Sequence, residues 1–331
     1  PAPGETLADA WLEKDGEKIT RRFFYPGQRQ IDQAMKLGGK MLDGSKALYR
    51  DPSLASVMAR EGGEITRELL QALSLADDPP TPLKAPLGVI KRCAWADPLP
   101  LDEVKAVGRA LGCTVNDVLL ACAAGALRSH LIECGEDVDG LVLRATVPVN
   151  LRPLEHAKKL GNHFGLVFLE LPVGEPNPVA RVRHVADNMD RIKSSRQAIM
   201  TFGALAALGM TPTPVQRMAL DLFSRKATAV ATNVPGPQMP LYLAGTRISE
   251  LMFWVPQSGS IGLGLSILSY QGRVHFGLIA DAKSIPEPGR VTARFGQQFE
   301  ALLYSVLMED WGVPIDPADA QDTLRRLCGT A

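Results

Sequence analysis

The stretch Ala231-Thr232-Asn233-Val234-Pro235-Gly236-Pro237 constrains the fold more than any other part of this sequence. Pro235 fixes its own φ angle and lacks a backbone donor. Pro237 keeps the preceding Gly236 out of the helical region, and Gly236, as a glycine, can adopt a positive φ. We therefore expect a strand at 228–233 that ends at Asn233 and leads into a stiff turn. A turn whose asparagine bonds its own backbone explains the stretch, and so does a binding site that uses the amide.

The charge balance argues against a nucleic-acid partner. The 331 residues carry 36 basic and 36 acidic side chains, and 6% of them are aromatic. A neutral chain without a basic block offers no electrostatic footprint for a phosphate backbone, and the few aromatic residues offer little for base stacking. The length is sufficient for one large domain or for two.

The cysteines and the hydropathy pattern indicate a cytoplasmic protein. The five cysteines are odd in number, scattered and without a CxxC pair, so we interpret them as reduced thiols; they are Cys93, Cys113, Cys122, Cys134 and Cys328. We find no signal peptide and no run of 18 apolar residues, so we expect neither secretion nor a membrane span. The chain opens at Pro1 with a polar segment, which leads us to expect missing N-terminal sequence.

The pattern divides the chain into three parts. Residues 1–86 are predicted as a helical linker region, with apolar residues at helical spacing between 27 and 76 and a proline-rich stretch at 77–86 that excludes helix and central strand. Residues 87–310 alternate between strand and helix, and residues 311–331 form a tail. Strands interspersed with helices, some of them in hairpins, predict an α/β fold with a mixed sheet and flanking helices.

The predicted elements share simple signals, which are β-branched or aromatic runs bounded by Gly and Pro for strands, and 3.6-residue periodicity for helices. We expect strands at 88–96, 142–149, 164–171, 228–233, 248–255, 261–269 and 273–281, and helices at 101–110, 114–130, 177–193, 197–209, 213–224 and 288–308.

Histidine, cysteine and glycine patterns give little catalytic signal. His163 and His275 stand out because each lies in or beside a predicted strand, but neither has a carboxylate or thiol partner in the sequence. The chain has no HExxH, no paired Cys/His spacing and no glycine-rich phosphate loop with lysine, so we predict no metal and no cofactor.

A pair of polar residues opens an otherwise apolar helix. Thr114 and Asp117 are spaced as a capping box, and Asp117 also favours the positive end of the helix, so a structural role accounts for both. The cap does not explain Asn116. Its amide needs a partner, which is either the backbone or a ligand.

Four fragments occur in an order that resembles the bacterial wax ester synthase/acyl-CoA:diacylglycerol acyltransferase family. They are Thr114-Val115-Asn116-Asp117-Val118-Leu119, Pro148-Val149-Asn150-Leu151-Arg152, Leu160-Gly161-Asn162 followed by Phe164-Gly165, and Asn233-Val234-Pro235-Gly236-Pro237. The resemblance covers residues 88–308. It implies a chloramphenicol acetyltransferase-like subdomain, one of two similar α/β subdomains with a tunnel between them.

The resemblance also implies an activity and its substrates. Members of this family transfer a fatty acyl group from acyl-CoA to diacylglycerol or a long-chain alcohol, in triacylglycerol and wax ester synthesis. We therefore expect an acyltransferase of lipid biosynthesis and glycerol metabolism that uses acyl-CoA as a substrate. It would be cytoplasmic and membrane-associated, at the inner face of the cell membrane or on lipid inclusions.

The resemblance assigns site residues around the tunnel. Asn116 is the catalytic candidate, with an oxyanion-stabilising or positioning role, and the substrate-binding candidates are Asp117, Asn162, Asn233, Pro235 and Gly236. The general base of the family is the second histidine of a His-His-x-x-x-Asp-Gly motif, and this chain contains no His-His pair. We therefore expect the linker and the C-terminal subdomain only, incomplete for catalysis.

Two alternatives stay open at this point. One is that the chain is a non-catalytic member of the same fold, which binds an acyl chain or a partner without turnover. The other concerns residues 198–226, where apolar residues with Arg217, Arg225 and Lys226 fit either a peripheral membrane segment or a buried helical hairpin.

Overall fold

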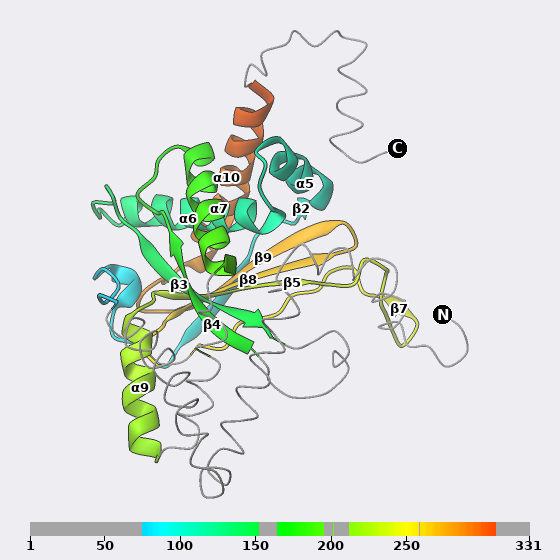
Figure 1. Cartoon of the computed structure of the whole chain (residues 1–331). Coiled ribbons are helices and arrows are strands. Elements are labelled where there is room, and N and C mark those ends of the chain that lie inside the picture. Colours follow the sequence, from blue (N-terminus) through cyan, green and yellow to red (C-terminus); the bar gives the residue numbers. More distant parts are fainter. Residues whose placement is uncertain (1–74, 152–163, 195–200, 202–211, 258, 309–331) are drawn as a thin grey trace, which may run out of the picture.

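The computed structural model describes residues 75–151, 164–194, 201, 212–257 and 259–308. One twisted mixed sheet runs through the molecule in the strand order β1-β9-β8-β5-β3-β4, with the short strand β2 also paired to β9 (Figure 1). Its strands are β1 (Lys91–Trp95), β2 (Leu99–Pro100), β3 (Leu143–Asn150), β4 (Phe164–Leu171), β5 (Ala229–Pro235), β8 (Leu263–Tyr270) and β9 (Arg273–Asp281). The central pairs β3–β5 and β5–β8 are parallel and the other pairs are antiparallel.

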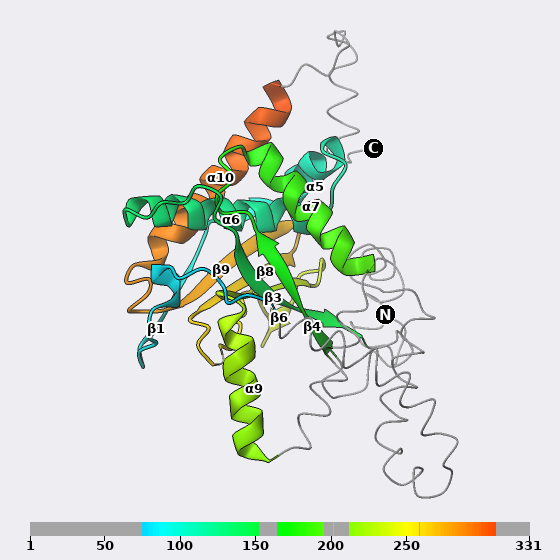
Figure 2. The same ribbon diagram turned by 60° about the vertical axis from the view of Figure 1, so that its left-hand side comes forward.

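Four helices cover one face of this sheet, whereas α9 (Thr213–Arg225) stands on the other side (Figures 1 and 2). The four are α5 (Leu101–Ala110), α6 (Val115–Glu133), α7 (Pro178–Ser194) and α10 (Pro288–Met308). The main hydrophobic core lies between them and the sheet and includes Ala229, Leu265, Phe276 and Phe295. The α/β class and the mixed sheet with flanking helices are therefore confirmed.

Helix α6 is central because it is apolar on every side. Its length and hydropathy would allow it to cross a membrane, but 72% of the relevant window is buried inside the protein, as in a core helix. Gly125 lies in its middle, at a point where an added Cβ would stand 2.2 Å from Arg181 Nη1 and from Gln298 Oε1. The buried guanidinium of Arg181 donates to that Gln298 oxygen over 2.7 Å, so Gly125 makes room for a polar bridge between α7 and α10.

Most predicted elements are confirmed within a few residues, and one is wrong. Residues 248–255 form no strand, because this segment crosses the sheet face opposite α6 and packs its side chains there. A Cβ on Gly277 would meet Met252 Sδ and Trp254 at 2.9 Å, which shows how closely the segment approaches β9. The hairpin of β6 (Tyr242–Leu243) and β7 (Thr246–Arg247) was not predicted. The predicted helices at 27–76 and 197–209 lie outside the described residues, apart from Leu75, Ala76 and Thr201.

Candidate functional site

The first turn of α6 carries the capping box that the sequence predicts. The backbone N–H and the hydroxyl of Thr114 donate to Asp117 Oδ2 over 2.9 and 2.7 Å, and the N–H of Asp117 donates back to Thr114 Oγ1 over 3.3 Å. Asp117 is 2% exposed, and its other oxygen, Oδ1, has no hydrogen-bond partner in the described part of the chain. Burial and the charge of Asp117 raise the pKa of the neighbouring Cys113 thiol to about 12.

The structure brings the two asparagines singled out in the sequence into direct contact. Asn233 Nδ2 donates to Asn116 Oδ1 over 3.0 Å, across 117 positions of the chain. The contact follows from the two-residue period of a strand, since Ala229, Ala231 and Asn233 share the face of β5 that packs against the helices. Asn116 is 3% exposed, and within the described residues its Nδ2 makes no hydrogen bond.

The turn after Asn233 is stiff, but it differs from the sequence prediction in two respects. Strand β5 does not end at Asn233; it stays paired with β8 as far as Pro235, which lies opposite Ser269. Gly236 does not have a positive φ. A Cβ there would lie 2.3 Å from the Ser269 carbonyl oxygen, so close backbone approach is what requires the glycine.

Asn233 lies where two parallel strands separate. Strand β5 pairs with β3 only at Ala229 and Val230, while β3 continues along β4 to Asn150. Asn233 therefore projects from a part of β5 that has β8 on one side and, within the described residues, no ladder on the other. The parallel strands carry this amide to the N-terminus of α6, where backbone N–H groups have no intrahelical partner and the helix dipole favours negative charge.

The remaining candidates are not part of this contact. Asn162 and His163 lie outside the described residues. His275 is 2% exposed and points to the sheet face opposite the helices, since its neighbours Val274 and Phe276 belong to the helix-packed core. Its Nε2 has no partner in the described part of the chain, and burial lowers its pKa, an effect that nearby Arg273 reinforces and Glu250 opposes.

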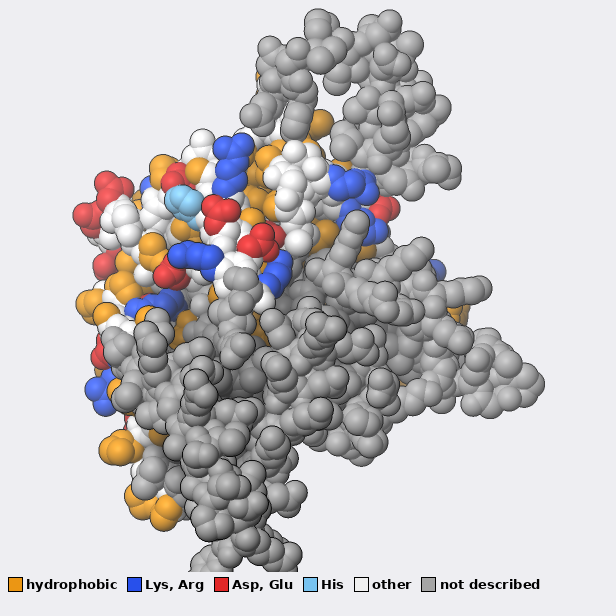
Figure 3. Space-filling view, in the orientation of Figure 1, with side chains coloured by type: hydrophobic (Ala, Val, Ile, Leu, Met, Phe, Trp, Pro, Cys, Tyr) orange, Lys and Arg blue, Asp and Glu red, His pale blue; other side chains and the backbone are white. Residues whose placement is uncertain are grey.

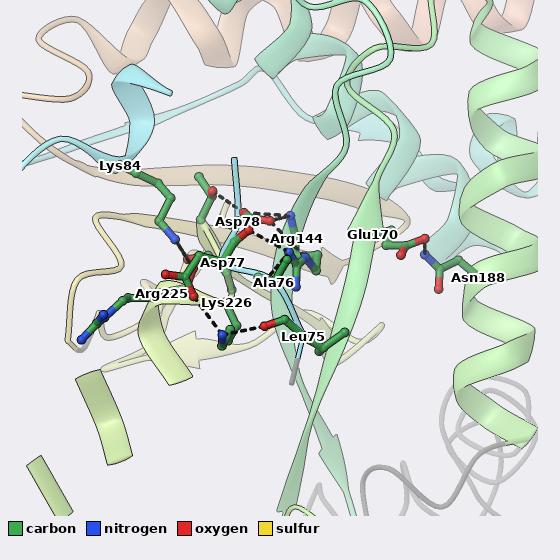
Figure 4. Close-up of polar contacts among 12 residues, drawn as sticks. Leu75, Ala76, Asp77, Asp78, Lys84, Arg144, Glu170, Asn188, Arg225 and Lys226 are labelled. Carbon is green, nitrogen blue, oxygen red and sulfur yellow. Dashed lines mark hydrogen bonds and ion pairs between the residues drawn. The ribbon is translucent and has the colours of Figure 1, made fainter. Parts of the chain in front are cut away.

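A second polar cluster, which the sequence did not reveal, holds the proline-rich segment to the start of β3 and β5 (Figure 4). The buried carboxylate of Asp78 accepts from the Arg144 backbone N–H and side-chain Nε, each over 3.1 Å, and from Thr228 Oγ1 over 2.5 Å. Lys226 Nζ binds Asp77 over 2.8 Å and the Leu75 carbonyl over 2.5 Å. We call the set Asp77, Asp78, Arg144, Lys226 and Thr228 the anchor cluster; it makes 77–86 a docked segment.

The described residues around these clusters were searched for grouped metal ligands, and the face in Figure 3 for grouped charges. Among the described residues, no group of three or more His, Cys, Asp and Glu side chains is placed to hold a metal ion. On the described part of the face in Figure 3, basic and acidic side chains are interspersed. What the asparagine pair offers chemically is an amide donor and the positive end of a helix.

Comparison with known proteins identifies the family of this chain. Residues 4–119 match the wax ester synthase/diacylglycerol acyltransferase catalytic domain, and residues 160–303 match the WS/DGAT C-terminal domain. The probable diacylglycerol O-acyltransferase tgs1 of Mycobacterium tuberculosis is 29% identical over 78% of this chain and 56% of its own length. The probable diacylglycerol O-acyltransferase tgs2 of the same organism is 32% identical over 73% of this chain and 55% of its own length.

A solved structure shows the same fold. The wax ester synthase/diacylglycerol acyltransferase from Marinobacter aquaeolei VT8 superposes with a TM-score of 0.55, at 23% identity, over 74% of this chain and 57% of that one. The chain thus spans little more than half the length of the relatives that it matches. On the two domain matches and these relatives, the chain belongs to the wax ester synthase/diacylglycerol acyltransferase family.

Proposed function

We propose that this protein is an O-acyltransferase that takes a fatty acyl group from acyl-CoA and transfers it to diacylglycerol or to a long-chain alcohol. The family membership and the names of the relatives support this reaction class. The observation that carries the proposal is the contact of Asn116 with Asn233 at the N-terminus of α6, because it presents an amide donor beside a positive helix end.

The amide donor suits the charge that develops during acyl transfer. When the acceptor oxygen attacks the thioester carbon, the carbonyl oxygen becomes negative, and the C–S bond then breaks to release coenzyme A. Asn116 Nδ2 is the group that would donate to this oxygen. Removal of one such donor from a dry site costs about 3 kcal/mol, or about 10²- to 10³-fold in kcat.

The proton of the acceptor hydroxyl must go to a base, and we propose that these 331 residues do not supply it efficiently. The chain has no His-His pair, and His275 is buried on the sheet face opposite Asn116. A general base contributes about 10²- to 10⁴-fold. We therefore expect slow ester formation by this chain on its own.

We also propose that the protein works in the cytoplasm at a lipid surface, because its acceptors dissolve in lipid. Of the segment expected to contact membrane, α9 lies in the described part, and its Met218 and Leu220 are 68% and 45% exposed. Arg217 and Arg225 lie on the same helix and would favour anionic lipid. Flotation with anionic vesicles tests this; a chain that stays at the bottom of the gradient does not bind such a surface.

A direct assay tests the activity. The purified chain is incubated with radiolabelled palmitoyl-CoA and either diacylglycerol or hexadecanol, with and without imidazole as an external base, and esters are separated by thin-layer chromatography. We expect slow ester formation, faster with imidazole and reduced at least 10²-fold by Asn116→Ala, while the surface control Lys105→Ala changes nothing. Failure to bind acyl-CoA would refute the proposal, and loss of activity in His163→Ala or His275→Ala would identify a base within the chain.

A second function is favoured by one observation, the absence of a His-His pair. A non-catalytic member of this fold would bind an acyl chain or a partner without turning it over. Acyl-CoA binding without ester formation, even in imidazole, would support this function over the first.

A further inference from the structure

We infer that Asn233 is a positioning residue, whose amide fixes the orientation of Asn116 so that Asn116 presents its N–H donors, and not its oxygen, to the acyl group. This inference rests on the proposed acyltransferase function and adds a role for Asn233 other than contact with substrate. It starts from one contact, Asn233 Nδ2 to Asn116 Oδ1 at 3.0 Å.

A primary amide has two chemically opposite ends, and rotation about its last bond exchanges them at little steric cost. An Asn116 side chain without a neighbour would sample both orientations, and only one of them places a donor where an oxyanion forms. Because Asn233 donates to Asn116 Oδ1, the acceptor end is occupied and Nδ2 is directed elsewhere. Within the described residues Nδ2 has no hydrogen-bond partner, so it is free for a ligand.

The surroundings hold Asn233 in place. It lies in β5, which pairs with β8 from Ala229 to Pro235. The following turn is tied to the β8–β9 hairpin, since Gln238 Nε2 donates to the Gly236 carbonyl over 2.9 Å and to Ser269 Oγ over 3.3 Å. The stiff turn after Asn233 therefore does more than reverse the chain, because it also restrains the residue that orients Asn116.

The decisive variant is Asn233→Asp, which keeps the shape of the side chain and reverses its polarity. An aspartate at this position can only accept, so Asn116 would rotate and donate its Nδ2 to the new carboxylate. NMR of the side-chain amide groups tests this without any need for activity. The Asn116 signals are assigned by their loss in Asn116→Ala, and their exchange with water is measured in both proteins.

We expect the Asn116 amide protons to exchange rapidly in the parent protein and at least about 10-fold more slowly in Asn233→Asp, as a charge-assisted hydrogen bond forms. Slow exchange in the parent protein, or unchanged Asn116 signals in Asn233→Asp, would overturn the inference. The NMR measurement gives either outcome even if the chain forms no ester. Failure of the inference can therefore be distinguished from failure of the proposed function.

A double-mutant cycle in the ester-forming assay provides the kinetic arm. If Asn233 acts through Asn116, the loss of kcat in Asn116→Ala/Asn233→Ala equals that in Asn116→Ala alone within about 3-fold, and KM is unchanged in Asn233→Asp. We expect Asn233→Asp to lower kcat by about 10²-fold, like removal of an oxyanion donor. Multiplicative losses in the double variant would show that Asn233 acts independently of Asn116, which contradicts a positioning role.

Discussion

The polar side chains near the two ends of β5 differ in how fully their hydrogen-bonding groups are paired. At its start, Thr228 joins the anchor cluster, in which the Asp78 carboxylate accepts from Thr228 and Arg144. Near its other end, Asn233 donates a hydrogen bond to Asn116, whose Nδ2 has no hydrogen-bond partner in the described part of the chain. A saturated cluster stabilises the fold, whereas an unsaturated one keeps hydrogen-bonding capacity for a ligand. The difference separates a structural end of the strand from the end that carries the proposed site.

The largest effect on stability is expected from removal of Asp78. Its side chain is 0% exposed and that of Arg144 is 14% exposed. Asp78→Ala would therefore leave the backbone N–H and Nε of Arg144 and the Thr228 hydroxyl without this acceptor, while Arg144 Nη2 keeps the Ala76 and Asp77 carbonyls. We expect a loss of about 3–5 kcal/mol in the free energy of unfolding, measured by urea denaturation. The exposed pair Lys105–Asp102 is the control, and Lys105→Ala should cost less than about 0.5 kcal/mol. A loss below 1 kcal/mol in Asp78→Ala would remove the distinction between the two ends.

At the Asn233 end of the strand, we expect a substitution to have a small effect on stability and a larger effect on kcat. Asn233→Ala removes one neutral hydrogen bond from a half-buried position, so its cost in unfolding free energy should be about 1 kcal/mol. The same variant should lower kcat about 10-fold, since Asn116 is then free to rotate and spends less time with its donor toward the substrate. Urea denaturation and the ester assay on one preparation measure both quantities. Destabilisation as large as that of Asp78→Ala, with kcat unchanged, would mean that both ends of β5 are structural.

Lowering the pH should reduce the stability of the fold through a third region, the sheet face opposite the helices. Burial lowers the pKa of His275 in the folded state, so the unfolded chain takes up a proton first as the pH falls through about 6.5. Stability is therefore unaffected at pH 8 and decreases from about pH 7 downward until the lowered pKa is passed. His275→Gln should flatten this decrease, measured as thermal midpoints between pH 8 and pH 5. The buried His130, whose pKa is also lowered by burial, remains in both proteins and leaves a residual slope. Identical slopes in the two proteins would contradict the burial of His275.

The sequence predicted local features well. Helix α5 and strands β4 and β9 have the bounds expected from periodicity, and the capping box of Thr114 and Asp117 forms as its spacing indicates. These features depend on neighbours within a few positions. The same holds for the β8–β9 hairpin, where Gln271 and Gly272 both have positive φ, as a tight two-residue turn requires.

Features that depend on distant segments were not predictable in this way. Asn116 and Asn233 were each selected as site residues, but their contact spans 117 positions and no local pattern pairs them. Residues 248–255 have the composition of a strand because Met252 and Trp254 pack on a sheet face, which gives the same alternation without sheet pairing. The burial of Asp78 had no signal at all, since two aspartates before a proline-rich stretch are typical of an exposed loop.

The smallest effect is expected in the reactivity of the Cys113 thiol, beside the first turn of α6. Cys113 is half-buried beside Asp117, and burial together with that charge raises its pKa to about 12, so at pH 8 it should react much more slowly with a disulfide reagent than the exposed Cys134. Asp117→Asn removes the charge but keeps the side-chain shape, so the pKa of Cys113 should fall and its labelling, measured by mass spectrometry of peptides, should accelerate a few-fold. Cys122 is fully buried with a pKa of about 12 and is the internal control, because Asp117 does not contribute to its pKa. Equal acceleration at Cys122 would mean that the substitution loosens α6 as a whole. Acceleration confined to Cys113 would show that the first turn of α6, which carries Asn116, responds to charge while the buried middle of the helix remains inaccessible.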